Sequence, residues 1–421
     1  MSPKTPTTAR TEQPAPALVP KLRFPEFRGA EGWQEYAGNH LFDQISDKNP
    51  EPGLPVLAIT QEHGAIPRDM IDYHVSVTDK SIESYKVVRV GDFIISLRSF
   101  QGGIEYSQYH GICSPAYVIL RLRTEGSDAY YKHYLKTDRF IQILTKNLEG
   151  LRDGKMISYK QFSELHIPTP APAEQQKIAD CLSSLDELIA AQARKLDALK
   201  THKKGLMQQL FPREGETQPR LRFPEFQNAG EWDVRTIGEM FSLINGCAFK
   251  PEDWKPTGTP IIRIQNLNDP SAEFNYSQAP VPERNRVESG DLLFAWSGTL
   301  GSSFGARIWN GPSGVLNQHI FKVLMDEHQI TLLFALLVLA RIEEEIARRT
   351  HGFKASFVHV KKSDLVQVEM LLPAVPEQQR IADCLTSLDA LITATTQELE
   401  TLKTHKKGLM QQLFPSAALS S

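Results

Sequence analysis

The chain has 421 residues, 41% hydrophobic and 23% charged, which is ordinary for a globular protein and long enough for two or more domains. Its net charge of −3 lacks the basic excess typical of proteins that bind nucleic acid unaided. The N-terminus has no apolar signal core, and the longest apolar run, Leu332 to Ala340, is too short to cross a bilayer, so we expect a cytoplasmic protein without a membrane segment.

The beginning of the chain predicts a disordered tail followed by the first copy of a tandem duplication. Residues 1–20 are rich in Pro, Thr and Ala and contain too few apolar residues to fold. Beyond them, several landmarks occur twice at a constant offset of 199 residues. These are the hexapeptide LRFPEF (22–27 and 221–226), a tryptophan (Trp33 and Trp232) and a Gly-Asp pair (Gly91-Asp92 and Gly290-Asp291). Each Gly-Asp pair precedes an apolar run, as a turn into a buried strand does.

The middle of each copy predicts an α+β globule of about 150 residues, enough for its own core. Short apolar runs favour strands at 56–60, 86–90, 93–97 and 116–122 in the first copy, and at 261–265, 292–296 and 319–324 in the second. A helical pattern follows at 128–148 and at 330–349, and each copy then has a basic loop that contains glycine. Between the landmarks the two copies have different sequences.

Each copy ends in a long helix, residues 174–212 and 377–415, and about three-quarters of the aligned positions are identical. Prolines delimit each run, which predicts a helix of about 36 residues, or roughly 54 Å. Apolar residues at alternating four- and three-residue steps form a heptad seam: Ile178, Leu182, Leu185, Ile189, Leu196, Leu199, Leu206 and Leu210 in the first, and Ile381, Leu385, Leu388, Ile392, Leu399, Leu402, Leu409 and Leu413 in the second. A narrow apolar stripe of this length needs a partner helix to cover it, and the other long helix is the obvious candidate. Four polar residues interrupt the seams and either fix the register or face solvent or a partner: Gln192, Lys203, Thr395 and Lys406.

Sequence motifs for catalysis are absent. The chain contains no P-loop, no dinucleotide fingerprint, no N-P-P-[FY] amino-methyltransferase motif and no H-E-x-x-H or G-x-S-x-G sequence. Its four cysteines show no C-x-x-C pairing, so neither a disulfide framework nor a zinc site is indicated. Glu252, Asp253 and Lys255 lie in a proline-flanked loop without a second carboxylate strand. We therefore predict no catalytic residue, no metal ligand and no cofactor in this chain.

Taken together, the repeated segments resemble the DNA specificity subunit of type I restriction-modification systems. The segments that carry the resemblance are the L-R-F-P-E-F…W openings, the Gly-Asp turns, the E-Q-Q-[KR]-I-A-D-C-L helix starts and the K-K-G-L-M-Q-Q-L-F-P endings, and it extends over residues 21–415. The resemblance implies an α+β fold in which two target recognition domains alternate with two long helices that pair as an antiparallel coiled coil, with pseudo-two-fold symmetry. The expected partition is a first domain at 21–170, a helix at 171–212, a linker at 213–220, a second domain at 221–373, a helix at 374–415 and a tail at 416–421.

The resemblance also implies a function. Each recognition domain would read one half of a split site on double-stranded DNA, while the helices set the spacing and dock two modification subunits. Those subunits carry S-adenosylmethionine and methylate adenines, and restriction subunits add cleavage driven by ATP with Mg²⁺. Partner subunits would then supply much of the phosphate contact, so we expect the isolated chain to bind DNA weakly and with strong salt dependence.

Fork-shaped or bidentate side chains on loops are suited to reading bases. On this basis the candidate DNA-binding residues of the first domain are Gln61, Glu62, Arg98, Ser99, Gln101, Arg152 and Lys155. Those of the second are Arg263, Gln265, Asn266, Trp296, Ser297, Asn317, Gln318, His319 and Lys354. Arg152, Lys155 and Lys354 lie in loops with glycine and suit phosphate contacts better than base reading. The alternative for each is a solvated loop residue, and for Trp296 a core residue.

Two other functions fit parts of the pattern. One is a coiled-coil DNA-binding regulator or scaffold without methyltransferase partners, which would purify alone. The other is a self-sufficient restriction or modification enzyme, which the missing motifs disfavour. The T-H-K-K blocks at 201–204 and 404–407 have either a duty common to both halves, such as contact with a partner subunit or phosphate, or simply a solvated face.

Overall fold

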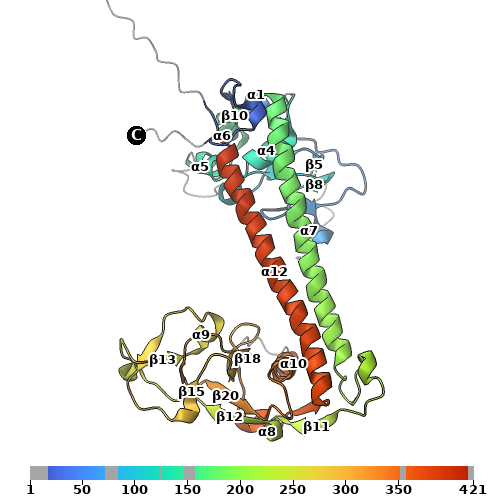
Figure 1. Cartoon of the computed structure of the whole chain (residues 1–421). Coiled ribbons are helices and arrows are strands. Elements are labelled where there is room, and N and C mark those ends of the chain that lie inside the picture. Colours follow the sequence, from blue (N-terminus) through green and yellow to red (C-terminus); the bar gives the residue numbers. More distant parts are fainter. Residues whose placement is uncertain (1–17, 72–83, 124, 147–156, 351–356, 416–421) are drawn as a thin grey trace, which may run out of the picture. The chain divides into compact units, whose positions relative to one another are not determined.

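The computed structural model describes residues 18–71, 84–123, 125–146, 157–350 and 357–415 (Figure 1). The expected tails lie outside these ranges except for residues 18–20, of which Leu18 pairs with Trp33 in an antiparallel bridge. The chain divides into two compact units, Met1–Arg194 with Thr396–Ser421, and Lys195–Thr395. Each unit therefore contains one globular domain, the first half of one long helix and the second half of the other.

The first domain is built on a four-stranded antiparallel sheet of order β2-β9-β6-β7. Its strands are β2 (Phe42–Ile45), β9 (Val118–Leu122), β6 (Phe93–Ile95) and β7 (Glu105–Tyr106). Three strand pairs complete it: β1 (Gln34–Ala37) with β10 (His166–Thr169), β3 (Leu57–Thr60) with β4 (Gly64–Pro67), and β5 (Lys86–Val88) with β8 (Gly111–Cys113). The short helices are η1 (Pro25–Phe27), α1 (Gly38–Leu41), η2 (Arg68–Met70), α3 (Ser99–Gly102), α4 (Asp128–Tyr134), α5 (Asp138–Lys146) and α6 (Tyr159–Ser163).

The second domain repeats this plan. Its main sheet has the order β12-β20-β16-β18, with β12 (Phe241–Asn245), β20 (Ile320–Met325), β16 (Leu292–Ala295) and β18 (Gly305–Ile308). A second sheet contains β14 (Asn275–Ser277), β13 (Thr259–Ile262), β19 (Gly314–Leu316) and β15 (Arg286–Val287), while β11 (Asp233–Thr236) pairs with β22 (Glu369–Leu372) and β17 (Ser297–Thr299) with β21 (Phe357–His359). The helices are η3 (Pro224–Phe226), α8 (Ile237–Met240), η4 (Pro251–Asp253), α9 (Ile264–Asn268), η5 (Glu283–Asn285), α10 (Leu332–Thr350) and α11 (Lys362–Leu365).

The Gly-Asp turns have the same geometry in both domains, as the repeat predicts. Gly91 and Gly290 have φ of 95° and 100°, which glycine adopts without strain. The carboxylate of Asp92 accepts a hydrogen bond of 2.7 Å from the backbone N–H of Arg89, and that of Asp291 accepts one of 2.7 Å from Glu288. Each turn opens directly into the central strand of the sheet, β6 or β16.

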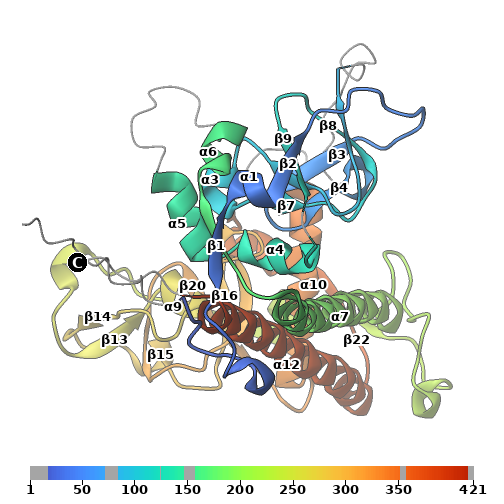
Figure 2. The ribbon, with the colours of Figure 1, turned by 90° about the horizontal axis from the view of Figure 1, so that it is seen from above.

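The two long helices, α7 (Pro172–Leu210) and α12 (Val375–Leu413), run antiparallel and lie side by side in both views (Figures 1 and 2). Both are slightly longer than predicted, because the prolines expected to precede them lie within their first turns, where proline is tolerated. All sixteen seam residues are buried or half-buried. Across the pair, Lys203 reaches Asp389 and Lys406 reaches Asp186, each at 2.5 Å, and Gln192 bonds to Glu398. Thr395 is buried. These contacts favour the register interpretation of the polar seam positions.

The helix ends are part of the domain cores. In the first unit, Leu413 and Phe414 at the end of α12 pack among the aromatic residues of α4, with Phe414 5.6 Å from the rings of both Tyr130 and Tyr134. In the second unit, Leu210 and Phe211 at the end of α7 take the equivalent place against Trp232 and Phe334. Burial of these residues gives a physical reason for the same Leu-Phe pair at both helix ends although the domains differ.

Two sequence predictions of secondary structure need correction. The helix expected at 128–148 is two helices, because the Thr137 side chain accepts from the Phe140 N–H at 3.2 Å and starts α5 as a new helix. Its last two residues lie outside the described ranges. The strand expected at 261–265 ends at Ile262, because the Asn266 side chain accepts from the Arg263 N–H at 3.1 Å and caps α9. The expected helix at 330–349 is confirmed, starting two residues later at Leu332.

Candidate nucleic-acid interface

In the first domain, two loops that are distant in sequence meet at the expected DNA-reading residues. The tight turn between β3 and β4 is closed by Thr60, whose hydroxyl accepts from the His63 N–H at 3.0 Å and donates to the Gly64 carbonyl at 3.2 Å. Gln61 in this turn donates through Nε2 to the carbonyl oxygen of Arg98 at 3.3 Å. Gln61 and Arg98 therefore belong to one surface, as the base-reading hypothesis requires.

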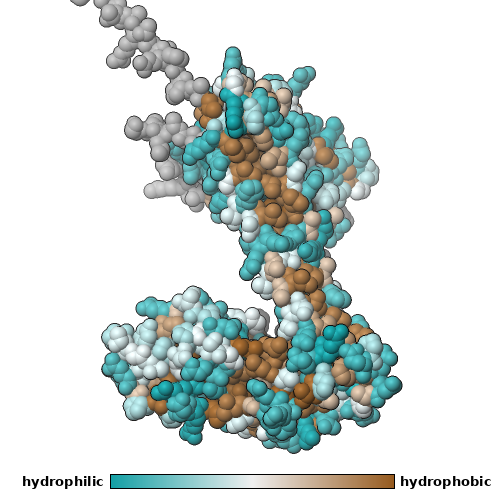
Figure 3. Space-filling view, in the orientation of Figure 1, coloured by the Kyte–Doolittle hydropathy of each residue, from teal (hydrophilic) through white to brown (hydrophobic). Residues whose placement is uncertain are grey.

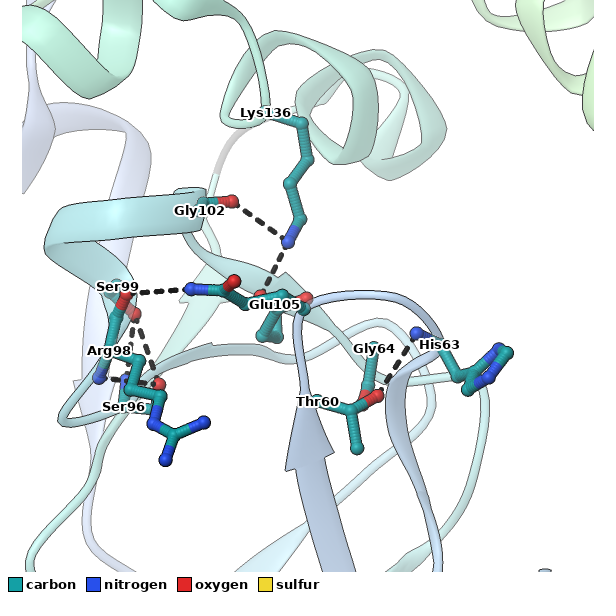
Figure 4. Close-up of polar contacts among 10 residues, drawn as sticks. Thr60, His63, Gly64, Ser96, Arg98, Ser99, Gly102, Glu105 and Lys136 are labelled. Carbon is teal, nitrogen blue, oxygen red and sulfur yellow. Dashed lines mark hydrogen bonds and ion pairs between the residues drawn. The ribbon is translucent and has the colours of Figure 1, made fainter. Parts of the chain in front are cut away.

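The Arg98 segment is a structured turn rather than a free loop (Figure 4). The Ser99 hydroxyl accepts from the Ser96 N–H at 2.9 Å, and the Arg98 N–H donates to the Ser96 hydroxyl at 3.2 Å. These bonds start the one-turn helix α3. Arg98 is exposed, and no hydrogen bond or ion pair of its guanidinium is found among the described residues, so the guanidinium is available to an external acceptor. Glu62 and Gln101 are exposed as well.

In the second domain, the corresponding surface lies around Trp296, and its side chains are mostly aromatic. Trp296 directly follows β16 and is half-buried between His319, at 5.4 Å between ring centroids, and His359, at 4.7 Å. Phe321 stacks on the same indole at 5.8 Å. The side chains of Gln318 and His319 are half-buried too, and Gln318 Oε1 and His319 Nδ1 have no partner among the described residues. The structure thus brings Trp296, Gln318 and His319 together, but Gln318 Oε1 and His319 Nδ1 are themselves buried, so a base contact through either atom would require the side chain to turn outward.

Two further candidates of the second domain serve the protein itself. Arg263 lies over the Trp254 ring at 5.0 Å and donates to Asn275 Oδ1 at 2.8 Å. Gln265 is exposed and donates to the Glu273 carbonyl at 3.2 Å. Arg263 would have to give up both contacts to reach a base, whereas Gln265 needs only to rotate.

Four of the expected base-contacting residues are buried, and we remove them from the set. Ser99 bonds to its own turn, Asn266 caps α9 and donates to the Ala272 carbonyl at 3.1 Å, and Ser297 and Asn317 lie inside the second domain. A buried side chain is not exposed to a ligand at the surface, and those of Ser99 and Asn266 also use their polar groups internally. Arg152, Lys155 and Lys354 lie outside the described residues.

The structure adds two residues that sequence reasoning missed, Phe357 and His359. Both are exposed on β21, which pairs with β17 so that His359 lies opposite Ser297 and Phe357 opposite Thr299. Strand pairing brings them to the surface around Trp296, from which they are separated by about 60 residues in the sequence. No local sequence pattern predicts such a pairing.

The surface around Arg98 and the surface around Trp296 occupy equivalent positions in the duplicated framework. At the offset of 199, Leu97 and Arg98 correspond to Trp296 and Ser297. The chain after β8 reads Ser114-Pro115-Ala116 where the chain after β19 reads Asn317-Gln318-His319. The framework is shared while the side chains at its edge differ in chemistry. Fold and site together define a duplicated protein whose two domains share one framework and differ in the side chains at its edge.

Comparison with known proteins identifies the family to which this chain belongs. The profile of the type I restriction modification DNA specificity domain matches residues 36–201 and again residues 229–404. The two matches cover most of the chain, and the protein belongs to this family. It is a DNA specificity subunit, the non-catalytic subunit of a type I restriction-modification system.

Individual relatives agree with this assignment. The chain is 25% identical over 357 residues to the specificity subunit of the type I restriction enzyme MjaVIII from Methanocaldococcus jannaschii, with 81% of each chain covered. It is 26% identical over 188 residues to the EcoBI specificity subunit from Escherichia coli, covering 44% of this chain and 38% of that one. Among solved structures, the S subunit from M. genitalium has the same fold, with a TM-score of 0.57, 17% identity and coverage of 95% and 100%. A structure described as showing complex assembly and conformational transition of the type I R-M system gives a TM-score of 0.54, with 18% identity and coverage of 91% and 98%.

Other kinds of site find no support in the described part of the chain. No group of three or more His, Cys, Asp or Glu side chains there is placed to hold a metal ion. The four cysteines are free thiols. Among the described helices, none combines the length and hydrophobicity that a bilayer span requires.

Proposed function

We propose that each domain reads one half of a bipartite DNA target, with the first reading surface formed by Gln61, Arg98 and Gln101 and the second by Trp296, Gln318, His319 and His359. The observation that carries the proposal is the contrast between a repeated framework and unrepeated edge residues. Two copies of one domain with different readers suit two different half-sites. A guanidinium suits guanine, and a glutamine side chain suits adenine.

We further propose that the antiparallel helices fix the spacing of the half-sites and dock two copies of a modification subunit. Hydrophobic residues contribute to the surface along the helix pair (Figure 3). Leu188 and Leu391, at equivalent positions of α7 and α12, are 54% and 51% exposed. Two equivalent apolar contacts on a pseudo-symmetric pair suit two copies of one partner. In this proposal the modification subunits bring S-adenosylmethionine, restriction subunits bring ATP and Mg²⁺, and the complex acts on DNA in the cytoplasm.

Base selectivity of the assembled methyltransferase tests the reading surfaces. The measurement is the methylation rate of the target compared with targets that carry one substituted base pair. Arg98→Ala should relax a single position in one half-site, and Gln318→Ala a single position in the other half-site. Variants that slow methylation of all sequences alike would contradict base reading by these residues and indicate phosphate contact instead.

Purification tests the alternative of a regulator or scaffold without methyltransferase partners. When the chain is co-expressed with the modification subunit of its system, the two should elute together. Leu188→Glu with Leu391→Glu should weaken that association while leaving the fold intact, because both residues are solvent-exposed. Elution of the native chain alone, with full DNA affinity, would favour the regulator.

A further inference from the structure

An ion pair between a buried carboxylate and a half-buried ammonium lies beside the Arg98 turn in the first domain (Figure 4). Glu105 of β7 is 2% exposed, and its Oε1 is 2.5 Å from Nζ of Lys136, which follows α4. Lys136 Nζ also donates to the carbonyl oxygen of Gly102 at 3.0 Å. Desolvation makes buried ion pairs weak contributors to stability compared with apolar side chains of similar volume. A stabilising role alone is therefore a poor reason for placing one here.

Gly102 ends the one-turn helix whose first flanking residue is Arg98. The Lys136 ammonium thus holds the far end of the turn, while Ser96 and Gln61 hold the near end. Gly103 follows with φ of 81°, and a Cβ at this residue would lie 2.2 Å from the Leu135 carbonyl oxygen. The turn is therefore pressed against the segment between α4 and α5, and Lys136 donates a side-chain hydrogen bond from that segment to the turn.

We propose that Lys136, with Glu105 as its counter-ion, is a positioning residue that orients the turn 98–102 so that Arg98 can read DNA. Lys136 does not touch the DNA. It fixes the direction in which the guanidinium projects, and bidentate recognition of a base depends on that direction. The inference rests on the proposed reading role of Arg98.

The Lys136–Glu105 pair lies in the first domain. In the described part of the second domain, the segment after β16 forms strand β17, which pairs with β21 through its backbone. Loss of the Lys136–Glu105 pair should therefore affect only one half-site, and the other half-site provides an internal control in the same molecule.

The test is a double-mutant cycle in the complete complex with its modification subunits. Because Lys136→Met alone leaves a buried unpaired carboxylate, the variant used is Lys136→Met with Glu105→Gln, which removes both charges and keeps their volumes. The measurement is the ratio of methylation rates for the cognate site and for a site substituted at the base pair that Arg98→Ala relaxes. We expect the pair variant to lower this ratio about tenfold, the scale of one good bidentate contact, with selectivity at the other half-site unchanged.

Adding Arg98→Ala to the Lys136→Met, Glu105→Gln variant tests whether Lys136 acts by positioning Arg98 or only stabilises the domain in general. If Lys136 acts through Arg98, the triple variant discriminates no less than Arg98→Ala alone. A pair variant that keeps full selectivity, or a triple variant whose losses multiply, would overturn the inference and leave the reading role of Arg98 standing. Full selectivity of Arg98→Ala itself would overturn that reading role and the inference together.

Discussion

A buried arginine, Arg23, links the LRFPEF segment at residues 22–27 to the start of α7. Arg23 makes a bidentate ion pair with Glu174 at the start of α7, with both N–O distances 2.7 Å, and donates to the carbonyls of Ala30 and Glu31 at 2.8 and 2.9 Å. The two side chains are 7% and 2% exposed. Arg222 and Glu377 repeat the pair in the second unit, also at 2.7 Å.

Replacing Arg23 by methionine keeps most of the volume but leaves the Glu174 carboxylate buried without a counter-charge. Removal of one partner from such a pair costs about 3–5 kcal/mol, and the two carbonyls add about 1 kcal/mol each where water does not replace the lost donor. We therefore expect Arg23→Met to lower the free energy of unfolding of the first unit by about 4 kcal/mol. Adding Glu174→Met removes the isolated charge and should restore most of that loss.

Urea unfolding combined with hydrogen exchange measures this effect locally. In Arg23→Met, amides of residues 22–34 and of the first turns of α7 should lose protection, while the second unit keeps its own. The matched variant Arg222→Met should show the reverse pattern. A single variant as stable as the native protein, or a double variant less stable than the single one, would refute the argument from an unpaired buried charge.

Three further predictions concern pH, backbone strain and DNA affinity. Burial, assisted by nearby Lys406, lowers the pKa of His133 to about 3 from 6.5, so below pH 6.5 the unfolded chain binds a proton that the folded chain does not. The free energy of unfolding should thus fall by about 2 kcal/mol from pH 7.5 to pH 5, and urea titrations at both pH values should show a smaller fall for His133→Asn. An equal fall in the native protein and the variant would contradict the role of His133. Gly103→Ala should cost at least about 2 kcal/mol in a thermal melt, more than Gly53→Ala, since Gly53 has a similar φ of 88° but open space around it; equal losses would exclude the contact with Leu135. Fluorescence anisotropy should show weak, salt-sensitive DNA binding by the isolated chain, and a nanomolar Kd at physiological salt would count against a division of phosphate contacts among subunits.

The sequence predicts the framework of this protein well, because the strongest signals are local or repeated. Heptad spacing between prolines predicts each long helix, and the constant offset between landmarks predicts two similar domains. The Gly-Asp turns follow from the need for a positive φ and a side-chain acceptor. The antiparallel direction of the helices is implied by the family resemblance rather than by the seam, since a heptad pattern alone permits either direction.

The candidate site is harder to predict, because it depends on contacts between distant segments. The structure brings the candidates Arg98 and Gln61 together, but the same reasoning included Ser99 and Asn266, whose polar groups bond within their own turns. Polar type in a loop does not reveal whether a side chain faces outward. His359 and Lys136 reach the two surfaces from other elements, through strand pairing and a buried ion pair, and neither has a local signature.

The most direct test of the account is a genome-wide map of methylated adenines in cells that express this chain with its modification subunits. We expect one bipartite motif, with two specific half-sites separated by a non-specific gap of constant length. A single uninterrupted motif, a gap of variable length, or a methylation pattern that does not change when this chain is deleted would contradict the assignment of two readers on a helical spacer.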